Sequence, residues 1–346
     1  MLCLMSPEER VPKDHPLRKV KLLADAALAR LSPTFDAMYS ETGRPSVAPE
    51  RLLKAMLLIA LYSVRSDRQF CEQLDYNLLF RWFLDMDMVE ESFDATTFTK
   101  NRQRLLDHDV AGEFFRTVVE QARSAHLMSH EHFSVDGTLI ESWASMKSVR
   151  PKDDDDDHDS NSWGDFRGTK RTNDTHASKT DPDAKLARKG KGQGAKLAYM
   201  GHALMENRNG LLVDMLVTQA NGYAEREAAI EMLDRTRRSG RRITLGADRG
   251  YDARSFVEQL RGRVVTPHVA QHTDRRSAVD ERTTQHSGYP VSIRARMQIE
   301  KIFGWMKGIG GLRRARTRGT ERLQLSAYLI GTAYNLLRLS RLPIAT

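Results

Sequence analysis

The order of the elements predicted after residue 131 restricts the fold of this 346-residue chain more than any other feature. Strands are predicted, from alternating or short apolar runs that end at turn residues, over 132–140, 196–206, 211–220, 242–248 and 263–267. Helices are predicted, from apolar residues that recur at helical spacing, over 224–238, 253–260, 292–307 and 321–339. Three consecutive strands followed by alternating helices and strands indicate a mixed sheet with helices on its faces.

This order matches the ribonuclease H-like fold, so we expect an α/β chain whose mixed sheet carries flanking helices. The region before it, residues 1–125, has helical apolar spacing and predicts an N-terminal helical domain. The second domain is then expected over 126–346. Within it, residues 144–195 contain few large apolar side chains and predict an exposed, flexible polar insertion.

Basic residues gather at the C-terminal end of the chain. Residues 291–346 contain eleven Lys and Arg residues and two acids. The net charge of this segment, +9, exceeds the net charge of +8 of the whole chain. The other 290 residues are therefore close to neutral. A basic excess confined to one folded segment is typical of a protein that binds a polyanion, usually nucleic acid.

Several classes of protein are excluded by simple absences in the sequence. The longest apolar run, residues 55–62, is far shorter than the ~20 residues that span a bilayer. Two cysteines, Cys3 and Cys71, are too few for a disulfide scaffold or a Cys-rich metal site. Neither the phosphate-loop pattern of an ATPase nor the Gly-x-Ser-x-Gly elbow of a serine hydrolase is present. With no signal peptide visible, we expect a cytoplasmic protein with no membrane partner.

Three acids stand at positions where the predicted fold would bring them together. Asp136 lies in the first strand, Asp248 ends the fourth strand, and Glu300 lies in the helix after the fifth. The first and fourth strands of a ribonuclease H-like sheet are neighbours, so Asp136 and Asp248 are expected at one edge of a site that Glu300 approaches from its helix. Carboxylates suit Mg²⁺, a hard cation, and two such ions can support phosphoryl transfer.

The helix that carries Glu300 has a charged face. At 100° per residue, Arg296, Glu300 and Lys307 lie within 40° of one another. The two cations favour the charged form of Glu300 and are placed to contact phosphates. A simpler interpretation is an exposed ion pair between Arg296 and Glu300, which contributes little to stability.

These residues resemble the Asp-Asp-Glu transposases of bacterial insertion sequences, specifically family five of those elements, in the wider group formed by families four and five. The resemblance covers nearly the whole chain, through blocks at Val135-Asp-Gly-Thr-Leu-Ile-Glu-Ser-Trp, at Asn173-Asp-Thr-His-Ala-Ser-Lys-Thr-Asp-Pro-Asp-Ala and at Leu245-Gly-Ala-Asp-Arg-Gly-Tyr-Asp. Arg296-x3-Glu300-x6-Lys307 matches the signature around the third acid, and Ile293 replaces its Tyr.

The resemblance implies an enzyme that binds the terminal inverted repeats of its element as a homo-oligomer on double-stranded DNA. It implies that Asp136, Asp248 and Glu300 hold Mg²⁺ or Mn²⁺, as two ions, and catalyse DNA cleavage and strand transfer into a target. The phosphate contacts that it implies are Arg296, Lys307, Arg313, Arg314, Arg316 and Arg318. The helical domain would recognise DNA ends or dimerise, and the protein would associate with the bacterial nucleoid.

Two other functions remain open at this stage. One is a metal-dependent nuclease without strand transfer, which joined DNA products would exclude. The other is a catalytically inactive relative that binds DNA, which any metal-dependent cleavage would exclude. Retention of all three acids argues against the inactive relative, whereas Ile293 at the signature Tyr position favours it.

Overall fold

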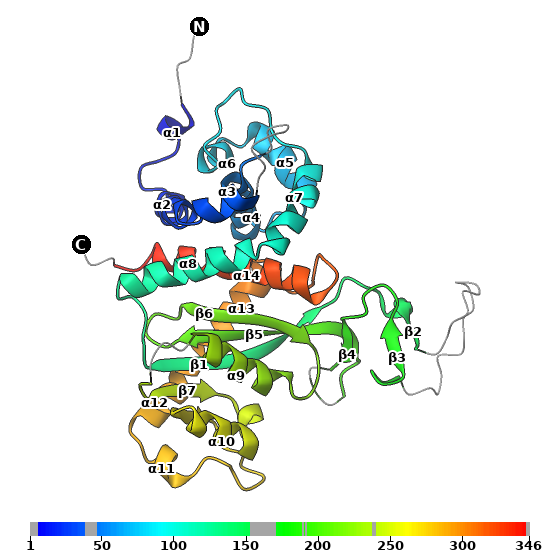
Figure 1. Cartoon of the computed structure of the whole chain (residues 1–346), viewed down its shortest axis with the longest axis vertical. Helices are drawn as coiled ribbons and strands as arrows, with labels where there is room; N and C mark the ends of the chain where they lie inside the picture. Colours follow the sequence, from blue (N-terminus) through cyan, green and yellow to red (C-terminus); the bar gives the residue numbers. More distant parts are fainter. Residues whose placement is uncertain are drawn as a thin grey trace.

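A computed structural model of the chain describes residues 6–38, 47–152, 171–188, 190, 192–236 and 240–343. The first part is helical and lies at the top of Figure 1. Its helices are α1 (Pro7–Arg10), α2 (Pro16–Ala29), α3 (Ser32–Met38), α4 (Pro49–Leu61), α5 (Asp67–Tyr76), α6 (Leu78–Phe83), α7 (Ala95–Asp107) and α8 (Val110–Ser124). Side-chain caps start several of them; for example, Ser66 accepts from the backbone N–H of Gln69, and Asp94 accepts from that of Thr96.

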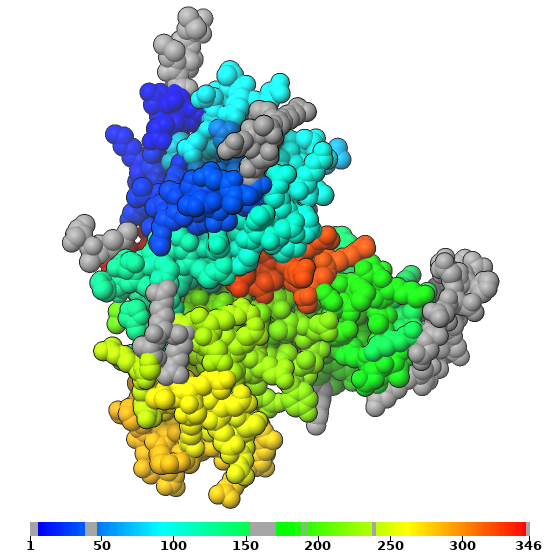
Figure 2. All heavy atoms as spheres, viewed as in Figure 1, coloured from blue at the N-terminus to red at the C-terminus, as the bar shows by residue number. Residues whose placement is uncertain are grey.

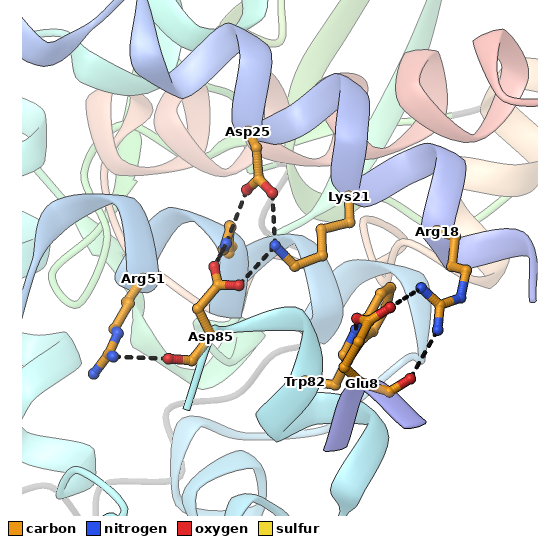
Figure 3. Close-up of polar contacts among 8 residues, drawn as sticks. Glu8, Arg18, Lys21, Asp25, Arg51, Trp82 and Asp85 are labelled. Carbon is orange, nitrogen blue, oxygen red and sulfur yellow. Dashed lines mark hydrogen bonds and ion pairs between the residues drawn. The ribbon is translucent and has the colours of Figure 1, made fainter. Parts of the chain in front are cut away.

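A buried lysine helps to hold these helices together. Lys54 of α4 is 3% exposed, and its Nζ lies 2.8 Å from Asp25 of α2 and also pairs with Asp85. Lys21 bridges the same two carboxylates at 2.6 and 2.8 Å (Figure 3). The network therefore joins α2, α4 and the segment after α6, and it supplies the buried ammonium group with the partners that burial requires.

The second part is a six-stranded mixed sheet. Its strands are β1 (His132–Glu141), β4 (Lys185–Ala187), β5 (Lys196–Glu206), β6 (Leu212–Gln219), β7 (Ile243–Ala247) and β8 (Val265–Val269). The five main strands lie in the order β6-β5-β1-β7-β8. β5 is antiparallel to both β1 and β6, whereas β7 is parallel to both β1 and β8. Numbered along the chain this order is 3-2-1-4-5, which confirms the ribonuclease H-like fold predicted from the element order.

Helices cover the sheet, and one of them also contacts the helical part. α9 (Ala224–Thr236) packs on β1, β5 and β6, and α10 (Arg254–Gly262) packs on β8. α11 (Glu281–Thr284) and α12 (Gly288–Arg296) also lie against β8, and α13 (Gln298–Gly308) lies against β1. The last helix, α14 (Thr320–Leu339), contacts α4, α8 and β6. In Figure 2 its orange and red atoms fill the seam between the helical part and the sheet.

Short strands form in the described part of the predicted insertion at 144–195. It contains β2 (Val149–Pro151), β3 (His176–Ser178) and β4, while residues 153–170, 189 and 191 lie outside the described residues. Buried Asp181 accepts hydrogen bonds from Ser142, Tyr199 and the backbone N–H of Gly319. Polar side chains thus tie the described part to the sheet where apolar burial cannot.

The helix predicted from Ser292 to Lys307 is two helices. α12 begins at Gly288, four residues earlier than predicted, and ends at Arg296 before α13 starts. Ser292 does not cap a helix; it is buried inside α12, where its hydroxyl lies 2.7 Å from Nδ1 of His268. No helix in the described part of the chain is long and apolar enough to cross a membrane.

Candidate functional site

Asp136 lies in the middle of β1, and Asp248 comes directly after the neighbouring parallel strand β7. The register of β1 with β7 pairs Ser134 with Gly246, and each aspartate stands two residues further along the chain. Because side chains alternate between the two faces of a sheet, both aspartates point to the same face. Burial, together with the charge of Asp248, raises the pKa of Asp136 to about 7. The two carboxylates therefore repel each other.

A cation from α12 approaches this pair. Nη1 of Arg296 lies 3.8 Å from Oδ2 of Asp136, and both side chains are 17% exposed. Nε of Arg296 is buried and has no hydrogen-bond partner. The guanidinium group therefore offsets part of the negative charge and keeps a donor for another acceptor.

Glu300 lies on α13, beyond the break that separates this helix from Arg296 in α12. It is exposed in the first turn of α13, between Arg296 and Lys307. Nζ of Lys307 donates to Oγ1 of Thr138 and to the carbonyl oxygen of Leu139, at 2.6 and 2.7 Å. Among the described residues, no three His, Cys, Asp or Glu side chains are grouped closely enough to hold a metal ion. Glu300 therefore forms no three-carboxylate group with the two aspartates among the described side chains.

The predicted basic contacts separate into two kinds. Arg296 and Lys307 contact β1, whereas Arg313, Arg314, Arg316 and Arg318 are exposed after α13. Arg314 donates to the carbonyl oxygens of Ser142 and Trp143, and its guanidinium lies 5.0 Å from the centre of the Trp143 ring. Arg316 donates to the carbonyl oxygen of Val64. These arginines therefore also connect the segment after α13 to its surroundings.

Two residues that the sequence analysis did not single out lie beside the aspartates. Glu225, in the first turn of α9, has its pKa raised by burial and by the charge of Asp248. Tyr251 is 0% exposed, and its hydroxyl has no hydrogen-bond partner. Its pKa is raised by burial and by the charges of Glu225, Asp136 and Asp248. Nothing local distinguishes Glu225 from other acids in first helical turns, so only the fold could identify it.

The donor set fits a divalent cation of the magnesium type. All the acidic side chains of this site offer oxygen atoms, and Mg²⁺ is commonly bound by one or two carboxylates together with water and substrate phosphate. The buried hydroxyl of Tyr251 and Nε of Arg296 are left without partners beside these carboxylates. Like charges and unsatisfied polar groups in one place are what a bound cation and its waters would stabilise.

Two regions of the chain match families of transposase domains. Residues 5–104 match the family described as "Transposase domain (DUF772)", and residues 164–336 match the family described as "Transposase DDE domain". The second match spans half of the chain and contains Asp248 and Glu300, whereas Asp136 lies before it. No curated protein matches the sequence.

Solved transposase structures match the chain at low sequence identity and low TM-score. A cryo-EM structure of the piggyBac transposase synaptic complex with hairpin DNA is 10% identical, with a TM-score of 0.43 over 94% of this chain and 75% of that chain. A crystal structure of a pre-cleavage Mos1 transpososome is 12% identical, with a TM-score of 0.22 over 96% of this chain and 89% of that chain.

Proposed function

Because the chain belongs to the insertion-sequence transposases with a DDE domain, we propose that Asp136, Asp248 and Glu300 are its Asp-Asp-Glu triad. The family carries out metal-dependent DNA cleavage and strand transfer. The observation that carries the proposal is the neighbouring pair of aspartates, Asp136 within β1 and Asp248 directly after β7, with Arg296 beside Asp136. Glu300 stands four residues beyond Arg296, in the first turn of α13, and we assign the third carboxylate of the triad to it.

In the first step water attacks a phosphorus atom at the end of the element. The bond from phosphorus to the 3′ oxygen breaks, which leaves a 3′-hydroxyl and a 5′-phosphate. In the second step that hydroxyl attacks a target phosphodiester, and the target's own 3′ oxygen leaves. Two divalent ions, Mg²⁺ or Mn²⁺, would activate the attacking oxygen and stabilise the leaving one. Asp136, Asp248 and Glu300 would hold them.

The basic residues act on the phosphates. Nε of Arg296, buried and without a partner, is placed to donate to a phosphate oxygen beside Asp136. We assign the exposed arginines after α13 to the DNA backbone, since each neutralised phosphate releases counterions. These are Arg313, Arg314, Arg316 and Arg318. The protein binds the element's inverted repeats and its target as double-stranded DNA, and it assembles on them as a homo-oligomer.

The test is strand transfer by purified protein on DNA that carries the two ends of its own element. We expect Asp136→Asn, Asp248→Asn and Glu300→Gln each to reduce joined products to background, because neutral amides bind divalent cations poorly. Glu321→Gln, an exposed acid at the start of α14, is the matched control and should retain activity. Cleavage without joined products would identify a nuclease, and full activity of Glu300→Gln would exclude the triad.

A further inference from the structure

We propose that Glu225 is a fourth carboxylate of this site, and that with Asp136 and Asp248 it binds a divalent cation before DNA is present. The inference rests on the proposed function, because it deepens the description of the same metal site. It differs from the proposed function in one respect: the ion that binds in the absence of DNA is held by Glu225 and not by Glu300.

The first observation is the close approach of Glu225 to β1. A Cβ atom at Gly137 would lie 2.8 Å from Oε1 of Glu225, closer than real Cβ contacts allow. Glycine at this position therefore leaves the space that the Glu225 carboxylate occupies, directly beside Asp136 in the chain. Any larger residue at position 137 would push this carboxylate away from the aspartates.

The faces of the sheet explain why Glu225 and Glu300 have different roles. Asp136 and Thr138 face α12 and α13, since Arg296 contacts the first and Lys307 contacts the second. Gly137 lies between them in β1 and faces α9. The two glutamates therefore approach from opposite faces. β7 pairs with β1 only as far as Gly246 with Ser134, so no described residue of β7 pairs with Asp136 or Gly137, and groups from both faces can meet there. Glu225 is half-buried next to the aspartates, whereas Glu300 is exposed.

The second observation is independent of the acids themselves. The Tyr251 hydroxyl is fully buried without a hydrogen-bond partner, although buried polar groups are almost always paired. The charges of Glu225, Asp136 and Asp248 all raise its pKa, so the three carboxylates lie close enough to act on this hydroxyl. It would accept from or donate to a water bound by the cation.

A divalent cation would balance the negative charge on this side. Three carboxylates act on one another and on Tyr251, and Arg296 makes the one ion pair to them that involves described residues. Mutual repulsion keeps the three from converging on one point in the metal-free protein, which agrees with the absence of a ready three-ligand group among the described side chains. A divalent ion removes this repulsion, so the three close around it.

The experiment is a titration of the full-length protein with Mn²⁺ alone, without DNA, followed by the electron paramagnetic resonance signal of free Mn²⁺. We expect Glu225→Gln to weaken Mn²⁺ binding at least about tenfold. Glu227→Gln, an exposed acid in the same helical turn, and Glu300→Gln should bind Mn²⁺ as the wild type does. Unchanged affinity in Glu225→Gln would overturn the inference, as would an equal loss in Glu300→Gln.

Thermal melting separates a metal ligand from a structural residue. Without metal, Glu225→Gln should melt at or above the wild-type temperature, because it removes a charge that repels the aspartates. Added Mn²⁺ should raise the melting temperature of the wild type more than that of the variant. A lower melting temperature of the metal-free variant would assign Glu225 a structural role. Loss of strand transfer in Asp136→Asn would stand in either case, so the two proposals fail separately.

Discussion

At the scale of single residues, Asp214 shows what burial does to a carboxylate outside the candidate site. It lies in β6 with its side chain 8% exposed, and Oδ2 has no hydrogen-bond partner. The nearest cation, Arg235 of α9, is 3.8 Å away. Burial raises the pKa of Asp214 to about 6. The backbone N–H of Met215 and the charges of Arg235 and Arg116 lower this pKa, but by less than burial raises it.

The sign of the pH dependence follows from this shift. The folded state binds the Asp214 proton more tightly than the unfolded state does, so the contribution of this carboxyl to stability is greatest below about pH 4 and is lost as the pH rises through about 6. We expect ionisation of this carboxyl to lower the free energy of unfolding by about 3 kcal/mol between about pH 4 and pH 6. Asp214→Asn should lack this loss when urea unfolding is measured from pH 4 to pH 8. Asp36→Asn, at an exposed position, is the control. Parallel curves for wild type and Asp214→Asn would contradict the prediction.

Residues differ in how much of their role their own sequence shows. Asp136 and Asp248 could be predicted because each stands in a predicted strand of a recognisable order. Glu206 could not: its carboxylate is buried and accepts from the backbone N–H groups of Ser129, Arg208, Asn209 and Leu211. The surroundings of Glu225 and Tyr251 could not be predicted either, because they are formed by segments distant in the chain.

At the scale of elements, the join between α12 and α13 determines where the site's cations point. The backbone N–H of Met297 bonds to the carbonyl oxygen of Arg294, a tighter turn than that of an α-helix. The sequence predicted one helix because its apolar spacing hardly changes there. The break lets Arg296 reach Asp136 while Lys307 anchors the far end of α13 to β1.

The two kinds of basic residue should therefore respond differently to mutation. Lys307→Ala removes two hydrogen bonds that hold α13 on β1, so it should lower stability by about 1–3 kcal/mol and leave the salt dependence of DNA binding nearly unchanged. Arg318→Ala, at an exposed position, should leave stability unchanged and reduce the salt slope by about 1. Urea unfolding and DNA-binding titrations at several salt concentrations measure both. A reversed pattern would show that Lys307, and not Arg318, contacts phosphate.

At the scale of the whole molecule, α14 joins the two parts that composition separates. It belongs to the C-terminal segment, yet it contacts α4 and α8 of the helical part as well as β6 of the sheet. Gly331 lies where these surfaces meet: a Cβ there would lie 2.8 Å from Sδ of Met215 and 3.1 Å from Phe115. The two parts therefore share one core, and we expect them to unfold together.

Gly331→Val tests this shared core. The added methyl groups must displace Met215 and Phe115, which should cost about 1–3 kcal/mol. Because both neighbours are affected, circular dichroism and tryptophan fluorescence should show one urea transition that shifts as a unit. Gly304→Val, in α13 with open space around it, should shift the midpoint little. Two separate transitions, only one of them moved, would mean that the parts are independently stable.

The sequence by itself determined the strand order, the helical N-terminal part and the candidate positions of Asp136, Asp248 and Glu300. Periodicity and turn residues are local properties, and a short list of sheet topologies is compatible with their order. Only the tertiary structure decided that Glu225 faces the aspartates through Gly137, that Tyr251 is buried close to them, and that polar contacts hold the described part of 144–195. Each of these depends on contacts between segments far apart in the chain, and such contacts leave no periodic trace in the sequence.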